Sequence, residues 1–252
     1  MTTLTSSQAG PAVPAGPAAT PFAAPALPLT RRPGRLVTDA PMRMFHWLFA
    51  LSFVGAYISA DSEHWRLVHV VLGYTFAGLL VWRLVYGLVG PRPARLSVLW
   101  RKVSGTRAWL KAMADAFKSG GSVMSAPWRQ GENLLMALAL VALLAMVIPL
   151  TLTGYASFHD WGDVLGGEAF EALHEFFGDA YLVGVLAHLA LLAWLSLTRR
   201  KNQALPMLTG RIPGPGPDLV KSERRWLAAL VLASVVAYWA WEAANRWGLL
   251  GA

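Results

Sequence analysis

The stretch LHEFFGDAYLVGVLAHLALLAW, residues 173–194, decides the fold. It is an apolar run that carries two histidines, His174 and His188, which lie 14 positions apart. In an α-helix, 14 positions turn through ~1,400°, about 40° short of four full turns, and rise ~21 Å. One helix therefore presents two imidazoles on one face, separated by most of the hydrocarbon thickness of a bilayer.

Four more apolar stretches accompany this one. Hydrophobic residues make up 55% of the chain and charged residues 14%, against about 25% charged residues in an ordinary soluble domain. A soluble helical bundle would need polar faces, which these stretches lack. We expect an all-α integral membrane bundle, in which a four-helix core is joined by a fifth transmembrane helix. The expected spans lie near residues 44–60, 68–89, 134–152, 176–197 and 226–244, and Pro41 could start the first of them earlier.

The basic residues that give the chain its net charge of +8 gather in alternate connections. They lie before the first span, between the second and third spans, and between the fourth and fifth. The connection between the third and fourth spans has no lysine or arginine, and it carries Asp160, Asp163, Glu168, Glu171 and Glu175. The positive-inside rule then predicts a cytoplasmic N-terminus and a periplasmic C-terminus. Because topology explains the charge, we expect no nucleic-acid partner.

The chain divides into four segments. Residues 1–35 are expected to form a disordered cytoplasmic tail, because residues 1–30 are mostly Ala, Pro, Thr, Ser and Gly with no charge. This segment lacks the basic region and unbroken apolar run of a signal peptide. Residues 36–200 form the predicted core, residues 201–225 a cytoplasmic connection, and residues 226–252 the fifth helix with a short outer tail.

The long connection between the second and third spans has an amphipathic pattern. Trp109, Leu110, Met113 and Phe117 fall on one helical face, with basic residues interspersed. This pattern favours a helix that lies in the cytoplasmic interface. A solvated loop is the alternative interpretation.

Four histidines fall at two depths in the predicted bundle. His46 begins the first span near the cytoplasm, and His69 begins the second span near the outer side. Depth then pairs His46 with His188 and His69 with His174. Two haems with two axial imidazoles each would use all four residues. A transition-metal site or a proton pathway could use them too, but ligands of one metal ion should converge at one depth.

Other residues support or limit this interpretation. Cysteine is absent, which excludes thiolate ligands, iron–sulfur clusters and covalent c-type haem. Gly73 and Gly184 each lie one turn from a predicted ligand, and Gly55 lies on the first span. A flat macrocycle between the helices would need such small residues, and so would close packing of the helices. His64 and His159 fall in outer loops and are expected to be solvated, with contact to a partner or a haem edge as the weaker option.

Two arginines are candidates for binding the propionates of the inner haem. Arg43 lies three residues before His46, and Arg83 closes the second span near the cytoplasm. Both could form charge-assisted hydrogen bonds with carboxylates. Positive-inside anchoring of the spans explains Arg83 better, and it explains Arg43 equally well.

Four segments together resemble the bacterial cytochrome b561 and nickel-hydrogenase b-type cytochrome family. The resemblance covers about residues 36–212. The segments are VTDAPMRMFHWLFA (residues 37–50), HVVLGYTFAGLLVWRLVYGLVGPRPARLS (69–97), the stretch 173–194 quoted above, and MLTGRI (207–212).

This resemblance implies a four-helix haem-binding bundle in the bacterial inner membrane, with two non-covalent b haems and a quinone site near one of them. It places the haem ligands on His46, His69, His174 and His188. The chain departs from the family before the third span. A Gly-His-Asn-Pro motif is common there in the family, whereas this chain has Gly131, Glu132, Asn133 and Leu134. Asn133 is the candidate quinone-binding residue that remains.

The expected function is respiratory electron transfer between the quinone pool and a redox partner. The partner would be a dehydrogenase or hydrogenase subunit, or a c-type cytochrome attracted by the acidic outer loop. We expect the quinone site on the cytoplasmic side, near Arg43, Arg83 and Asn133, and a homodimer is one possible assembly. A histidine-dependent transporter or proton pathway and a non-redox membrane anchor are the alternative functions.

Overall fold

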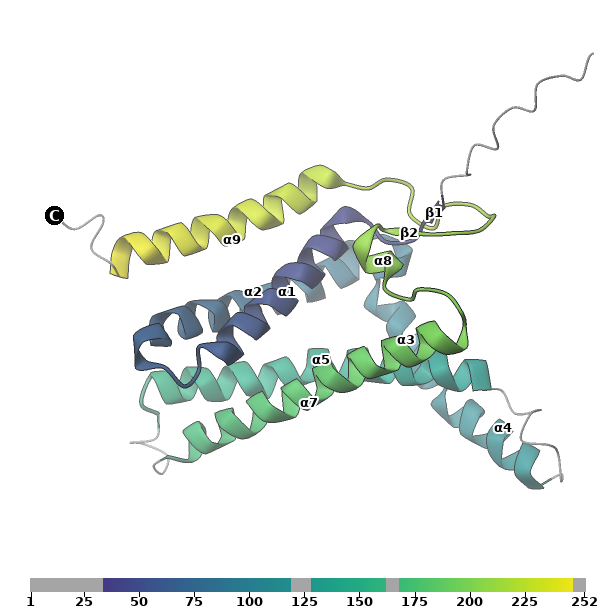
Figure 1. The fold of residues 1–252 in the computed structure, drawn as a ribbon, viewed down its shortest axis with the longest axis horizontal. Helices are drawn as coiled ribbons and strands as arrows, with labels where there is room; N and C mark the ends of the chain where they lie inside the picture. Colours follow the sequence, from purple (N-terminus) through teal and green to yellow (C-terminus); the bar gives the residue numbers. More distant parts are fainter. Residues whose placement is uncertain (1–33, 119–127, 162–167, 247–252) are drawn as a thin grey trace, which may run out of the picture. The chain divides into compact units, whose positions relative to one another are not determined.

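The computed structural model describes residues 34–118, 128–161 and 168–246, so the expected disordered tail lies almost entirely outside the described residues. The expected helical membrane bundle is confirmed (Figure 1). Its long helices extend past the expected spans at one end or both. They are α1 (Ala40–Ile58), α2 (Arg66–Val89), α5 (Trp128–Phe158), α7 (Ala169–Thr198) and α9 (Arg225–Arg246).

Helix α1 begins earlier than the apolar pattern suggests because its start is set by capping. The side chain of Asp39 accepts a hydrogen bond from the backbone N–H of Met42 at 3.4 Å, and Pro41 lies in the first turn. Both features favour a helix start, since the cap satisfies a free N–H and proline has none to satisfy. His46 therefore lies in the second turn of α1 rather than the first.

Four of the helices are long and apolar enough to cross a membrane. The segments are Glu63–Val89, Trp128–Phe158, Ala169–Thr198 and Arg225–Asn245. Helix α1 is the expected span that is not among them, because Arg43 and His46 lower the hydropathy of its first turns. It nevertheless runs beside α2 and packs against both α2 and α9 (Figure 1).

The core consists of two helical hairpins, α1 with α2 and α5 with α7, which meet mainly where α2 packs against α5. Aromatic side chains fill part of the space between them. Phe49 and Phe76 stack with ring centroids 4.1 Å apart, and Tyr181 of α7 lies 4.6 Å from Phe53 and 5.4 Å from Phe76. This cluster sits halfway along α7 between its two histidines.

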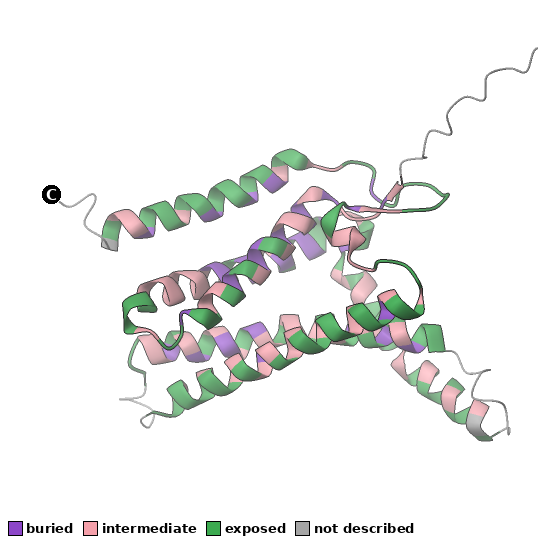
Figure 2. Cartoon of the chain, in the orientation of Figure 1, coloured by how far each residue is buried: buried purple, intermediate pink, exposed green. Residues whose placement is uncertain are grey.

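The outward faces of the bundle are apolar as well. Figure 2 shows that α7 and α9 are exposed over most of their length. Large apolar side chains are among the exposed ones, for example Val183 at 65%, Leu186 at 56% and Trp226 at 70%. In water such surfaces would drive association, whereas in a bilayer they face a solvent as apolar as themselves.

The connections at the basic end of the bundle are partly ordered. The helix predicted around Trp109–Phe117 is α4 (Thr106–Lys118), and α3 (Leu96–Ser104), which the sequence did not predict, precedes it and ends at Gly105. The proline-rich connection between α7 and α9 contains α8 (Leu205–Leu208) and the strand β2 (Arg211–Ile212). Strand β2 pairs antiparallel with β1 (Arg35–Leu36), so this connection is tied to the segment before α1.

Candidate functional site

His69 of α2 and His174 of α7 face each other across the bundle. Their ring centroids are 5.8 Å apart and their planes are nearly perpendicular, at 88°. Two imidazoles that bind opposite sides of one metal ion through bonds of ~2.0 Å place their ring centroids about 6 Å apart. The spacing of this pair thus suits two axial ligands of a single iron ion.

Hydrogen bonds to the backbone orient both rings. The Nδ1 atom of His69 lies 2.8 Å from the carbonyl oxygen of Ala56, and the Nδ1 atom of His174 lies 3.0 Å from that of Leu150. Because a carbonyl oxygen only accepts, Nδ1 must carry the proton in each ring. The Nε2 atom then keeps its lone pair, which is the state that a metal-binding imidazole requires.

Glycines leave space beside these two rings. Gly73 lies one turn after His69, and Gly178 lies one turn after His174. Outside the helix that carries each glycine, no described atom lies within 4 Å of the position where its β-carbon would stand. Two such open positions on facing helices, each one turn from a ligand candidate, leave room that a flat macrocycle could use.

A third glycine, Gly154 of α5, allows His174 to take its place. A β-carbon at Gly154 would lie 2.7 Å from Cε1 and 2.9 Å from Nδ1 of His174, which is too close. The ring therefore occupies the volume that a side chain would fill. Sequence reasoning missed both Gly154 and Gly178. Gly178 follows the same one-turn rule as Gly73, whereas nothing in the sequence indicates that Gly154 lies opposite His174.

The second pair, His46 of α1 and His188 of α7, lies toward the basic end. The two side chains lie near enough for a charge on one to act on the other. The Nδ1 atom of His188 is buried and has no hydrogen-bond partner within the described residues. A buried polar atom without a hydrogen-bond partner costs free energy. The atom therefore marks a place where a further bound group could supply the missing partner.

Arg83 belongs to the same region. It lies 14 positions after His69 on α2, and so on the same helical face about 21 Å toward the basic end. The guanidinium is buried, and its NH1 atom also lacks a partner in the part of the chain described. A β-carbon at Gly87 would lie 2.7 Å from this atom, so glycine gives the side chain room. The buried cation suits a propionate better than membrane anchoring, which needs an exposed side chain.

Arg43 points toward a different part of the molecule. Its NH1 atom lies 3.4 Å from the carbonyl oxygen of Leu208, and it packs beside Gly210, which has a φ of +77°. A β-carbon there would be strained by the backbone and would lie 3.2 Å from Arg43. Arg43 thus contacts the MLTGRI segment, although its buried Nε atom has no described partner.

Asn133 is bonded to α7. Its side-chain oxygen accepts a hydrogen bond from Arg199 at 3.0 Å, and the same arginine forms an ion pair with Glu132 at 2.7 Å. These bonds join the start of α5 to the end of α7 at the basic end. If Asn133 binds a quinone, it must do so while its side-chain oxygen accepts the hydrogen bond from Arg199.

The two loop histidines are both exposed. His64 contacts only Trp65 edge-on among the described residues. His159 is more structured than expected, because its Nε2 atom lies 3.3 Å from the hydroxyl of Tyr74 and its ring lies 4.2 Å from that of Tyr155. Asp163 of the acidic outer loop lies outside the described residues.

The donor set taken together fits haem. Two pairs of imidazoles lie at two depths, and the outer pair has the spacing, protonation and open space that a bis-histidine haem needs. Among the described residues, no group of three or more His, Asp or Glu side chains converges as the ligands of a bare metal ion would. This argues against the transition-metal alternative.

One comparison with known proteins matches this chain. The family model described as prokaryotic cytochrome b561 covers residues 37–210, which include all four histidines of the two pairs and exclude α9. No curated protein and no solved structure matches the chain.

Proposed function

The chain belongs to the prokaryotic cytochrome b561 family, and from this premise we propose that it binds two b haems and exchanges electrons with the quinone pool and a redox protein. As a member, it is a membrane b-type cytochrome of electron transfer. We assign His69 and His174 to one haem, and His46 and His188 to the other. The observation that carries the proposal is the facing, backbone-oriented pair of His69 and His174.

When bound, the haems supply the one-electron chemistry, and the chain tunes it. The Ala56 and Leu150 carbonyls hold the outer imidazoles in the ligating tautomer and raise their basicity. Arg83 places a buried positive charge near the inner pair, where it would bind a propionate and favour the reduced haem. The apolar core around Tyr181 keeps water from the space between the pairs.

We assign the basic end of the bundle to the cytoplasm. Helices α3 and α4, with Arg101, Lys102, Arg107 and Lys111, lie at this end, as do the starts of α1, α5 and α9. The positive-inside rule then puts the pair His46–His188 on the cytoplasmic side and the pair His69–His174 on the periplasmic side. The acidic outer loop would face a soluble partner such as a c-type cytochrome.

A transporter is less well supported. Transport folds of this size are expected to have unwound helices that line a mid-membrane site. Within the described residues, α5 continues through Pro149 without a break, and the aromatic cluster fills the middle of the core. The histidines also separate into two depths instead of forming one relay.

We predict that the purified protein contains two haems per chain. The pyridine haemochrome assay, set against protein mass from amino-acid analysis, should give a ratio near two, because each pair of imidazoles satisfies one iron ion. A reduced-minus-oxidised spectrum should show b-type bands. A ratio of one or of zero would refute the proposal that the chain binds two haems.

We also predict that Asn133→Ala slows haem reduction by quinol. The expected quinone site lies at the cytoplasmic end, and the change removes an amide beside Arg199 and Glu132. The measurement is the rate of haem reduction by a soluble quinol, with the double variant Asp160→Asn/Asp163→Asn as the comparison. The double variant should change only exchange with a c-type cytochrome and its salt dependence. The opposite pattern would move the quinone site to the outer side.

A further inference from the structure

Two side chains of α1 hold the last carbonyl groups of α8. Trp47 donates its indole N–H to the carbonyl oxygen of Met207 at 3.2 Å, and Arg43 donates to that of Leu208 at 3.4 Å. Carbonyl groups in the last turn of a helix have no partner within the helix, so they can accept these bonds. Arg43 and Trp47 are four residues apart and therefore lie on one face of α1. The end of α8 is thus fixed against this face.

The residue after this end of α8 is held just as closely. The backbone N–H groups of Val37 and Thr38 donate to the carbonyl oxygen of Gly210, at 2.8 and 3.1 Å. Gly210 has a φ of +77°, and a β-carbon there would lie 2.6 Å from the carbonyl oxygen of Thr38. Any other residue would be strained at this position. We call residues 207–210 the clamp, because these four hydrogen bonds tie them to the segment from Val37 to Trp47.

His46 lies between the two residues of α1 that the clamp holds. Its ring meets that of Trp47 edge-on, with centroids 5.6 Å apart and planes at 76°. Backbone carbonyls orient both rings of the outer pair, whereas neither His46 nor His188 has such a hydrogen bond among the described residues. Because the indole borders the imidazole, a fixed indole limits how far the ring of His46 can turn.

The clamp also joins the two helices that carry the inner pair. His46 is on α1, which packs against α2 and α9, and His188 is on α7, which packs against α5. The connection from α7 to the clamp is short and is itself fastened to α7. In it, the backbone N–H groups of Lys201 and Gln203 each donate to Ser196 at 3.1 Å. This bridge ties the start of α1 to the end of α7, at the end of the bundle where the inner pair lies.

We propose that the clamp positions His46 as an axial ligand of the inner haem, with Trp47 and Arg43 as its positioning residues. The carbonyl groups of Met207 and Leu208 fix one face of α1, and the indole of Trp47 fixes the plane of the imidazole. Groups that orient a metal ligand typically contribute about 10- to 100-fold to affinity. The inference rests on the proposed haem function, and it gives the clamp a role although none of its residues is a ligand.

The first test removes one hydrogen bond of the clamp. Trp47→Phe keeps an aromatic ring beside His46 but cannot donate to Met207. In the purified holoprotein, the low-spin EPR signal of the inner haem, identified as the one that His46→Ala abolishes, should broaden and shift, because the imidazole plane is no longer held. Transfer of the inner haem to excess apomyoglobin should become about tenfold faster. The outer haem should keep its signal and its rate.

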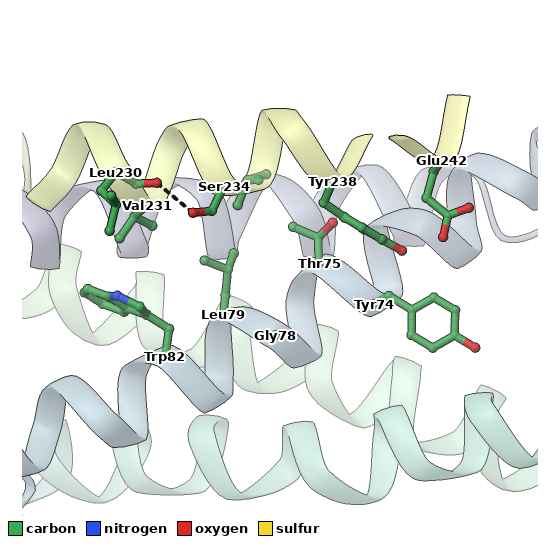
Figure 3. A pocket seen from close by; sticks show the side chains of 11 residues that line it. Tyr74, Thr75, Gly78, Leu79, Trp82, Leu230, Val231, Ser234, Tyr238 and Glu242 are labelled. Atoms are coloured by element: carbon green, nitrogen blue, oxygen red, sulfur yellow. Dashed lines mark hydrogen bonds between the residues drawn. The ribbon is translucent and has the colours of Figure 1, made fainter. Parts of the chain in front are cut away.

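The matched control for this variant is Trp239→Phe. Trp239 also donates one hydrogen bond to another helix, at 2.8 Å to the hydroxyl of Thr75, which lines a pocket between α2 and α9 (Figure 3). It lies ~21 Å along α9 from Arg225, which begins this helix at the basic end. Both EPR signals and both transfer rates should therefore match wild type. This control separates the positioning of His46 from the loss of any tryptophan hydrogen bond.

The second test displaces the clamp without changing α1. Gly210→Ala introduces a β-carbon that clashes with Thr38, and it should alter the signal and the transfer rate of the inner haem as Trp47→Phe does. Gly214→Ala is the control in the same connection. Gly214 also has a positive φ, +129°, but apart from its chain neighbours no described atom lies within 4 Å of its β-carbon position. This variant should keep the wild-type signal and rate.

Both variants must alter the inner haem alone. A wild-type signal and rate in either Trp47→Phe or Gly210→Ala would overturn the proposal. Equal changes in the two haems would also overturn it, because they would show a general loosening of the bundle. If Gly210→Ala does not fold, Trp47→Phe decides the question. The proposed function fails separately, since wild-type protein without two haems would refute it, whereas this inference fails when both haems are present and the inner one does not respond to the clamp.

Discussion

His69→Ala and His174→Ala are each expected to lower the haem content from about two per chain to about one, because either change leaves the outer iron with a single imidazole. The two rings lie 5.8 Å apart and are both held by backbone carbonyls, and no third His, Asp or Glu joins them in a ligand group among the described residues. His46→Ala and His188→Ala should each remove the other haem. Haem content by pyridine haemochrome and the band shape of the reduced spectrum measure the loss.

Two changes at the loop histidines serve as the matched controls. His64→Ala and His159→Ala should keep both haems, since both side chains are exposed and lie outside the two pairs. A double variant, His69→Ala/His174→Ala, should lose no more haem than either single change, because both residues hold the same iron. Loss of haem from a loop variant, or additive losses in the double variant, would show that the pairing is wrong.

Gly154→Val is expected to remove the outer haem although it alters no ligand. A β-carbon at this position would stand 2.7 Å from the His174 ring, so the added side chain must displace the imidazole from its present position. Changes that misplace a metal-binding histidine cost about 10- to 100-fold in affinity. Gly154→Ala should give a partial loss of haem, and Gly154→Val a larger one.

The control for this prediction is Gly78→Ala. Gly78 is also a helical glycine, but outside its own helix no described atom lies within 4 Å of its missing β-carbon, and its position nine residues after His69 turns it about 180° from that residue. This variant should keep both haems, which would separate a clash at His174 from a general intolerance of larger residues. Unchanged haem content in Gly154→Val would mean that α5 does not confine His174 as described.

Local patterns in the sequence predicted the helices and the histidine faces well. The apolar runs located the five long helices, because helix formation in a membrane requires only continuous hydrophobicity. The ends were less accurate, since Asp39 and Pro41 start α1 before its apolar run does. The histidines could be paired by depth from two features, the spacing of His174 and His188 on α7 and the alternation of helix direction. The family match over residues 37–210 covers nearly the same residues as the resemblance seen in the sequence. Their role as haem ligands remains a prediction.

The tertiary structure decided what lies opposite each of these residues. Helical periodicity says which face a side chain occupies, but it does not say which helix comes against that face. Only the packing of α5 on α7 places Gly154 and the Leu150 carbonyl beside His174, and it also ties Asn133 to Arg199. In the same way, only the packing shows that α9 lies mainly against α1, because long-range contacts between apolar surfaces depend on the shapes of the helices that meet.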